Sequence, residues 1–275
     1  MKYNSCVKEN NLPGIECGFN VTNGYYMSEL HWHPYYEVLV IRKSGSYTIS
    51  NSGSEYSGCG PSIFIQRPYS PHRMCADMNE PYERYIINID RASLSGFSGF
   101  FDELAIHDNS CLFMVIPTEE ELDGICGICD RIIEAVKNGD RVDSTLFKVM
   151  LLHHISMLSD CGHSVTGKKR FSYIQDVLQY ISENLSDKVT LEAMCERFDV
   201  GRTKFAEDFS EATGVGFKKY LTDLRQTRAR ELIESGSSII NASLETGYSS
   251  EAHFIKAFRE YWGMTPGEFR SSLKN

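Results

Sequence analysis

Three histidines and one glutamate in the first third of the chain have types and spacings that could bind a ligand. His31 and His33 stand two residues apart, Glu37 follows four residues later, and His72 comes further along the chain. On a β-strand, residues two apart project from the same face, so the first two imidazoles would lie side by side. Three imidazoles and a carboxylate suit a first-row divalent metal ion. Together with Tyr35, the same residues would also line a pocket for a small organic effector. The alternative without a ligand is that the histidines lie at a strand end and have their hydrogen bonds satisfied within the protein.

The segments around these residues are predicted to be β-strands. They are rich in β-branched and aromatic residues, and clusters of Gly, Ser, Pro and Asn separate them. Their short and regular spacing, without an intervening helical period, favours a sandwich or a small barrel. A short helix and loop are expected at 97–107. The predicted strands are 36–43, 45–50, 61–66 and 83–89.

An amphipathic helix is predicted to begin after Thr118. Glu121 follows three residues later, which gives a capping box, and apolar residues then recur at helical spacing. Cys126 and Cys129 lie on the apolar stripe of this helix, and the region lacks partners for zinc or redox chemistry. They are therefore expected to be small core residues. A second apolar helix is predicted over 144–158.

The length of the chain and a change in periodicity indicate two domains. At 275 residues, the chain is long enough for two domains of ordinary size. Residues 161–170 are small, polar and basic, and we interpret them as the linker. From Phe171 onward the apolar period is helical, and glycines supply the breaks. The predicted helices are 172–184, 191–198, 202–213, 217–235, 239–246, 250–261 and 266–273.

Two stretches of the second part share the plan of a helix-turn-helix unit. Residues 191–214 and 238–263 each contain a short apolar helix, a turn of three or four residues with Gly, and a second helix. The short turn holds the two helices at a steep angle, so the exposed face of the second helix can enter a major groove about 12 Å wide. Each second helix has two aromatic residues, four apart, that are expected to be buried: Phe205 and Phe209 in the first, Phe254 and Phe258 in the second.

These motifs resemble the DNA-binding domain of the AraC/XylS family of bacterial transcription regulators. The resemblance covers residues 174–270 and includes TLEAMCERFDV, a long helix that joins the two units, GYSSEAHFIKAFREYWGMTP and the closing GEFR. It implies that the two units read successive major-groove segments of double-stranded DNA. The alternative is that the charged residues of the second helices form an ordinary solvated helix face with no role in binding. The residues expected to face DNA are Arg202, Thr203, Ala206 and Glu207 in the first unit, and Ser250, Glu251, Ala252, His253, Lys256 and Arg259 in the second.

The sequence departs from the family pattern at several positions. Gly201 stands where the family has a Ser that would cap the first recognition helix, and Ser210 stands where it has a Lys. Glu207 and Asp208 place negative charge on a face that the family often makes basic. These departures predict DNA binding that is weak or strongly dependent on an effector.

The histidine pattern resembles the cupin double-stranded β-barrel. Cupin-like sensor domains are common at the front of AraC-type regulators, so the resemblance implies an effector-binding and dimerisation domain over 1–160 and a DNA-binding domain over 171–275. It also implies a homodimer formed through the helices of 118–160, with packing against the barrel alone as the alternative. A sugar is the effector suggested by analogy with family members. The residues that match the cupin pattern are His31, His33, Glu37, Gly45, Gly60, Pro68, Pro71 and His72.

Charge is unevenly distributed along the chain. Residues 1–167 contain 12 basic and 21 acidic residues and the remainder contains 16 of each, so the net charge of −9 lies entirely in the first part. This acidic part is not expected to bind nucleic acid. No apolar run is long enough for a membrane span and the start has no signal-peptide pattern, so a cytoplasmic protein without membrane association is expected. The nine cysteines are scattered and odd in number, as expected for reduced thiols.

The sequence is therefore interpreted as an effector-responsive, sequence-specific DNA-binding transcription regulator and not as an enzyme. The expected fold is α+β with two domains: an N-terminal cupin-like β-barrel with flanking helices and a C-terminal all-α domain with two helix-turn-helix units. The alternatives are a cupin metalloenzyme, a dioxygenase or isomerase with a degenerate helical domain, and a protein-binding module. Expected partners are double-stranded DNA, a small-molecule effector and a second copy of the chain, with RNA polymerase as a further candidate. No cofactor is assigned beyond the candidate divalent metal in the barrel.

Overall fold

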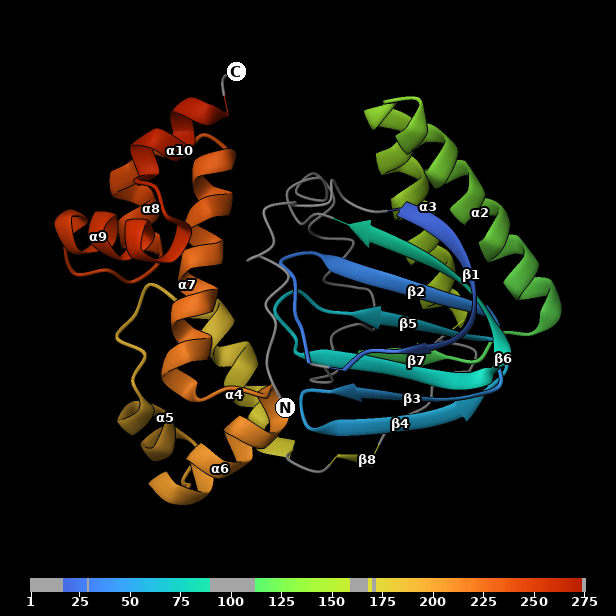
Figure 1. Cartoon of the computed structure of the whole chain (residues 1–275), viewed down its shortest axis with the longest axis horizontal. Coiled ribbons are helices and arrows are strands. Elements are labelled where there is room, and N and C mark those ends of the chain that lie inside the picture. Colours follow the sequence, from blue (N-terminus) through green and yellow to red (C-terminus); the bar gives the residue numbers. More distant parts are fainter. Residues whose placement is uncertain (1–16, 29, 90–111, 159–167, 170–171, 274–275) are drawn as a thin grey trace.

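The protein has two domains, a curved β-sheet covered by two helices and a separate group of helices (Figure 1). The predicted two-domain α+β fold is confirmed. The helix and loop expected at 97–107 lie outside the described residues. Among the helices that are described, none is long and apolar enough to cross a membrane. The computed structural model describes residues 17–28, 30–89, 112–158, 168–169 and 172–273.

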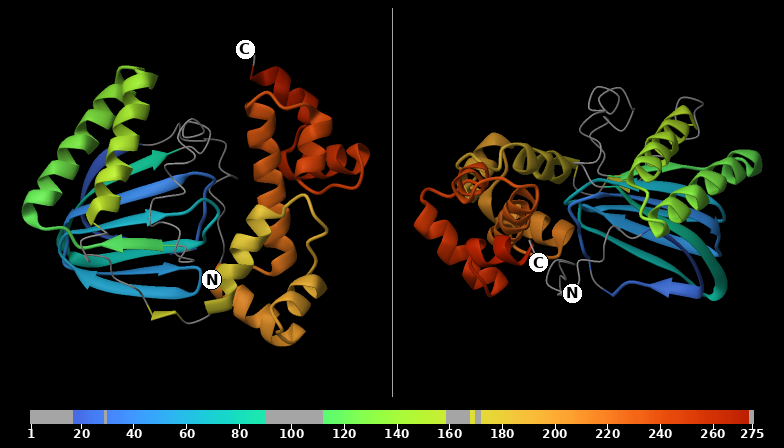
Figure 2. Two further views of the ribbon diagram at one scale, coloured as in Figure 1. Left: turned by 180° about the vertical axis from the view of Figure 1, so that it is seen from behind. Right: turned by 90° about the horizontal axis from the view of Figure 1, so that it is seen from above.

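Among the described residues, the sheet contains eight antiparallel strands: β1 (Cys17–Tyr26), β2 (Tyr36–Lys43), β3 (Ser46–Asn51), β4 (Ser54–Cys59), β5 (Ser62–Gln66), β6 (His72–Ile89), β7 (Leu112–Val115) and β8 (Lys168–Lys169). Their order is β7-β5-β2-β6-β3-β4-β8, and β1 pairs with β6 outside this path. One edge of β6 pairs with β2 through residues 83–89 and with β3 through residues 72–76, so the sheet bends along this long strand (Figure 2). The path of the described strands ends at β7 and β8, so they form an open, curved sheet. Its cupin-like character stays a prediction.

Alternate residues of the strands face two different cores. Val38 and Val40 of β2 pack in a core with α2 (Glu119–Lys137) and α3 (Arg141–Leu158). Leu39 and Ile41 pack with residues of β3, β5 and β6 on the opposite face. This follows from the period of two in a β-strand.

The start of α2 confirms the predicted capping box. The Thr118 side chain accepts a hydrogen bond from the Glu121 N–H, and the Glu121 carboxylate accepts one from the Thr118 N–H. Cys126 and Cys129 are buried on the apolar face, as predicted. Burial raises the pKa of Cys126 to about 11, so this residue remains a thiol at neutral pH.

The helical domain agrees closely with the sequence prediction. Each predicted helix is present, and its ends lie within one residue of the predicted ones, because side-chain caps and left-handed glycines mark them. The helices are α4 (Ser172–Glu183), α5 (Leu191–Arg197), α6 (Arg202–Thr213), α7 (Phe217–Glu234), α8 (Ile239–Glu245), α9 (Glu251–Trp262) and α10 (Pro266–Ser272).

Helix α7 organises this domain. Phe217, Tyr220 and Leu224 in its first half pack against α4, α5 and α6. Leu232 and Ile233 in its second half pack against the core of α8, α9 and α10. The two helix-turn-helix units therefore lie at the two ends of α7 (Figure 1).

The predicted linker is in part an element of the sheet. Lys168–Lys169 form β8 and pair with Glu55 and Ser54 of β4. The side chain of Gln175, at the start of α4, then donates a hydrogen bond to the Ser54 hydroxyl at 3.0 Å. The polar and basic composition of 161–170 gave no sign of this pairing, because a short strand of two residues has no period to detect. Residues 161–167 and 170 lie outside the described part.

Candidate functional site

The first helix-turn-helix unit is formed by α5 and α6. Asp199 in the turn has a φ of 50°, a left-handed conformation that Asp adopts more readily than most residues. Gly201 is the N-cap of α6 and provides no side-chain hydrogen bond, as expected from the missing Ser. Phe205 and Phe209 are fully buried, as predicted. The residues predicted to face DNA are all exposed: Arg202, Thr203, Ala206 and Glu207.

The second unit is formed by α8 and α9. Gly247 in its turn has a φ of 73°, and a Cβ there would lie 2.5 Å from the Leu185 carbonyl oxygen, so this turn packs tightly against the segment between α4 and α5. Ser250 is the N-cap of α9, as predicted, and its side chain accepts a hydrogen bond from the His253 N–H. Phe254 and Phe258 are buried. The residues predicted to face DNA are again exposed: Ser250, Glu251, Ala252, His253, Lys256 and Arg259.

Several cations on these two surfaces are paired with neighbouring carboxylates. Arg202 Nη1 lies 3.2 Å from Glu192 Oε1, and Lys256 Nζ lies 3.8 Å from Glu260 Oε1. Both pairs are exposed, so water and salt screen them strongly. Arg259 has no ion-pair partner among the described residues. It is therefore the cation of the second unit most available to a phosphate.

The sequence prediction did not assign a structural role to Asp208. Its carboxylate accepts hydrogen bonds from the Tyr173 hydroxyl and from Lys204 Nζ, both at 2.7 Å. The bond between Asp208 and Tyr173 therefore anchors α6, the first recognition helix, to α4. An i, i+4 spacing of Lys204 and Asp208 was visible in the sequence, but the contact with Tyr173 depends on tertiary packing.

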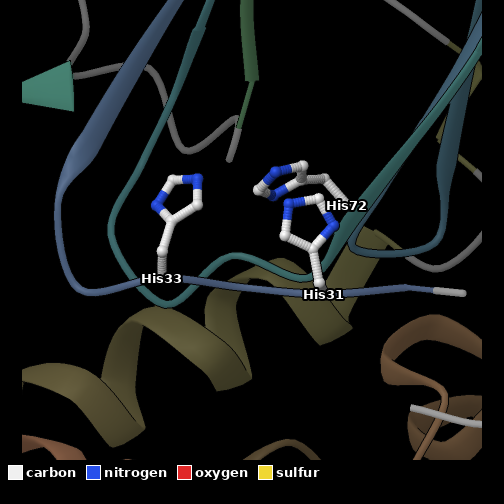
Figure 3. Close-up of side chains that lie close together, drawn as sticks. All are labelled: His31, His33 and His72. Atoms are coloured by element: carbon white, nitrogen blue, oxygen red, sulfur yellow. The ribbon is translucent and has the colours of Figure 1, made fainter. Parts of the chain in front are cut away.

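The three histidines come together at one end of the sheet (Figure 3). Nitrogen atoms of His31, His33 and His72 that could bind a metal lie within 4.8 Å of one another. His31 and His72 pair through two backbone hydrogen bonds of 3.0 and 2.8 Å. The expectation that His31 and His33 occupy a regular strand is wrong, because His31 forms an isolated bridge and His33 lies in the following loop. The imidazoles nonetheless approach each other.

Backbone carbonyl groups set the tautomers of His33 and His72. His33 Nδ1 lies 2.9 Å from the Tyr35 carbonyl oxygen and His72 Nδ1 lies 2.8 Å from that of Ser70, so each Nδ1 carries the proton. In the neutral rings each Nε2 is then an acceptor. Both Nε2 atoms are buried and have no hydrogen-bond partner among the described residues. The Glu37 carboxylate lies beside them, with oxygens 3.5 Å from His33 Nε2 and 3.8 Å from His72 Nε2.

Burial and charge set the protonation of the cluster. Burial, together with the nearby His33, lowers the pKa of His31 to about 4. Burial and the neighbouring histidines also lower the pKa of His72 well below its usual value. Burial tends to raise the pKa of Glu37, but its hydrogen bond with His33 and its electrostatic interactions with the three histidines outweigh this and hold the pKa at about 2. At neutral pH the site therefore combines an anionic carboxylate with neutral His31 and His72, which is the protonation that metal ions require.

Residues around the cluster complete the site. Gln66 Nε2 donates to Glu37 Oε1 at 3.1 Å and orients the carboxylate, a contact that the sequence prediction missed. Tyr35 stacks on His33 with ring centroids 4.1 Å apart. Trp32, which stands between His31 and His33 in sequence, is fully buried in the core shared with α7.

Comparison with known proteins finds similar proteins for the helical domain and for most of the chain. Residues 194–272 match the family model described as a helix-turn-helix domain. The virulence regulon transcriptional activator VirF of Yersinia enterocolitica is 28% identical over 245 residues, which cover 84% of this chain and 88% of VirF. The HTH-type transcriptional regulator YdiP of Escherichia coli K12 is 21% identical over 252 residues, which cover 89% of this chain and 82% of YdiP.

Other similar proteins differ in how much of the chain they match. The Msm operon regulatory protein of Streptococcus mutans is 26% identical over 105 residues, 38% of each chain. The crystal structure of ToxT from Vibrio cholerae O395 covers 93% of this chain and 98% of its own, with 16% identity and a TM-score of 0.40. Residues 194–272 are thus a helix-turn-helix domain, and the predicted resemblance of the chain to transcription regulators of the AraC type is confirmed.

Proposed function

We propose that the chain is an effector-responsive, sequence-specific DNA-binding transcription regulator. The observation that carries this proposal is the pair of helix-turn-helix units at the two ends of α7, whose second helices expose every residue expected to face DNA. Helix α7 has 18 residues, and a helix of this length spans about 27 Å. That length is comparable to the about 34 Å between successive major-groove segments on one side of B-DNA.

The two recognition helices would contribute differently to DNA binding. Arg259 would contact a phosphate, and Lys256 and His253 lie on the same exposed face. In the first unit, Arg202 must leave Glu192 before it can bind DNA, and Glu207 can only accept a hydrogen bond, for instance from a cytosine amine. We therefore expect the second unit to supply most of the salt-dependent affinity.

A salt titration of duplex binding tests this function. The probe is the promoter DNA next to the protein's own gene, and affinity is measured by fluorescence anisotropy at several salt concentrations. Removing one phosphate contact by Arg259→Ala should weaken binding by about 10-fold and reduce the slope of log K against log salt by about one. Arg141→Ala removes an exposed arginine from α3 and serves as the matched control. Absence of sequence-preferring, salt-dependent binding, with and without candidate effectors, would contradict the proposal.

The proposed effector site is the histidine cluster with Tyr35 and Glu37. In the described part of the chain, the buried Nε2 atoms of His33 and His72 lack a hydrogen-bond donor or a cation as partner. A divalent metal ion held by the cluster would provide such a cation. Sugar hydroxyls could also donate to these atoms. Calorimetric titration with Zn²⁺, Ni²⁺ and simple sugars distinguishes the two classes of ligand. Binding that survives His72→Ala unchanged would place the effector elsewhere.

The proposed dimer interface lies on the outer face of α3. Val142, Leu146 and Met157 are exposed apolar residues along this helix, and Val136 near the end of α2 is also exposed. A charge introduced by Leu146→Glu should dissociate a dimer formed through this face, whereas Glu134→Gln on α2 should not. Light scattering after size-exclusion chromatography measures the change. A dimer bound near a promoter would be placed to contact RNA polymerase.

A further inference from the structure

One residue connects the histidine cluster to the helix that carries both DNA-binding units. The backbone N–H of Tyr69 donates to the His33 carbonyl oxygen at 2.8 Å. Its hydroxyl donates to the Glu231 carboxylate, 2.9 and 2.8 Å from the two oxygens, and its carbonyl oxygen accepts from the Tyr220 hydroxyl at 2.8 Å. Glu231 and Tyr220 both belong to α7. Tyr69 is therefore tied to the cluster on one side and to α7 on the other.

The backbone next to Tyr69 also positions the cluster. The Ser70 carbonyl oxygen accepts from His72 Nδ1, and the His72 backbone pairs with that of His31. All three imidazoles are thus held by segments that are hydrogen-bonded to the loop containing Tyr69. A displacement of either segment must be accommodated by this loop.

Tyr69 is held in a conformation that its neighbours must stabilise. Its φ is 62°, in the left-handed region that a bulky residue rarely adopts. Trp32, which stands between His31 and His33 in sequence, packs on the Tyr69 ring with centroids 5.8 Å apart. The same indole lies 6.3 Å from the Tyr220 ring. Contacts from both domains therefore fix one conformation of this residue.

Binding of a metal ion would restrain the two segments that Tyr69 joins. The candidate ligand nitrogens lie within 4.8 Å of one another. In a tetrahedral site with metal–nitrogen bonds of about 2.0–2.1 Å, they would be about 3.3 Å apart. Coordination of a common ion would therefore draw these nitrogens together and restrain the segment with His31 and His33 relative to that with His72. The Tyr69 backbone lies between these segments, and its side chain reaches α7.

We propose that Tyr69 transmits occupancy of the histidine cluster by a divalent metal ion to α7, so that metal binding and duplex binding are thermodynamically coupled. This inference rests on the proposed function and names the regulation of the same site. Linkage requires that the metal change duplex affinity by the same factor as the duplex changes metal affinity. Tyr69 acts here as a positioning residue, because its side chain touches neither the metal nor the DNA.

The test measures this factor in the full chain with Co²⁺ as the probe, whose visible absorption reports binding directly. In the wild type, saturating Co²⁺ should change duplex affinity by about 5-fold or more, the lower end of typical allosteric coupling. Tyr69→Phe keeps the ring and the backbone contacts and removes only the hydroxyl bond to Glu231. It should retain the Co²⁺ spectrum and the metal-free duplex affinity, while the change in affinity falls toward 1-fold.

A matched variant separates coupling from a general loss of stability. Tyr85→Phe removes a tyrosine hydroxyl that donates to the Asp130 carboxylate at 3.0 Å, which joins the sheet to α2 instead of α7. It should leave the Co²⁺ effect on duplex affinity intact. If Tyr69→Phe keeps the full effect, or if Co²⁺ binds to the wild type without changing duplex affinity, the coupling is overturned while the proposed function stands. If Co²⁺ does not bind to the wild type, the proposal that the histidine cluster holds a divalent metal ion is overturned. Absence of any duplex binding would instead overturn the proposed function.

Discussion

The two helix-turn-helix units share one plan but differ in what they pack against. The core of the first unit contains Phe205 and Phe209 together with Trp32 and Tyr69 from the sheet domain. Among the described residues, the core of the second unit, around Phe258, is built only from the helical domain. A change in the sheet domain can therefore reach the core of the first unit through direct contacts, whereas in the described part of the chain the core of the second unit contains no residue of the sheet domain.

The units also differ in how their recognition helices are fixed and charged. Helix α6 lacks a side-chain N-cap and is anchored instead by the bond between Tyr173 and Asp208. Helix α9 has the Ser250 cap and exposes Arg259 without an ion-pair partner in the described part of the chain. The first unit thus depends on tertiary contacts for its position, whereas the second is locally defined and better charged for DNA. The difference suggests that one unit responds to a signal and the other provides steady affinity.

The largest expected effect separates the two cores. Phe205→Ala and Phe258→Ala each remove a fully buried ring and should each cost about 3–5 kcal/mol of unfolding free energy. Phe258→Ala should increase amide hydrogen exchange in α8, α9, α10 and the second half of α7, but not around Trp32. Phe205→Ala should increase exchange in α4, α5 and α6 and also around Trp32, because that core is shared. The corresponding Phe→Leu variants serve as controls, and increased exchange at Trp32 in Phe258→Ala would contradict the comparison.

A second prediction concerns the anchor of the first unit. Tyr173→Phe removes a hydrogen bond to the Asp208 carboxylate and should cost about 1.5–3 kcal/mol. Burial raises the pKa of Asp208, but its bonds with Lys204 and Tyr173 outweigh this and lower the pKa in the folded protein. A folded pKa below the unfolded value gives stability that is present at neutral pH and is lost as the pH falls below about 4.

The pH dependence provides the measurement for this anchor. Acid should loosen α6 before α9, because the second unit has no equivalent carboxylate anchor among the described residues. Hydrogen exchange at pH 3.5 and pH 6 would detect the order. Asp208→Asn cannot ionise and should abolish the difference between the two pH values in α6. Loosening of both recognition helices at the same pH would show that the anchor does not distinguish them.

The sequence determined the helical domain more completely than the sheet. Helix ends were predictable because they are encoded locally, by caps such as Thr118 and Ser250 and by left-handed glycines. Strand β6 was recognised only over 83–89, since its first half, HRMCADMNEP, is polar and has no clean alternation. The curvature of the sheet depends on this missed half, which pairs with β3.

The candidate site shows the same division between local and long-range information. The histidines could be selected from their types and spacing, and the cluster forms although only Glu37 and His72 lie on regular strands. The role of Tyr69 could not be predicted, because its partner Glu231 is 162 residues away in sequence. The left-handed backbone conformation of Tyr69 could not be predicted either, because tyrosine rarely adopts this conformation.

The smallest expected effect tests whether the missing cap explains part of the difference between the units. Gly201 has N-cap geometry, with φ −61° and ψ 141°, and a Cβ there meets nothing within 4 Å. Gly201→Ser should therefore stabilise the protein by a few tenths of a kcal/mol, and Ser250→Gly should destabilise it by a similar amount. Each change corresponds to a shift of about 1 °C in Tm, which calorimetry can resolve on matched samples. A loss of stability in Gly201→Ser would show that tertiary contacts, and not the absent hydroxyl, set the start of α6.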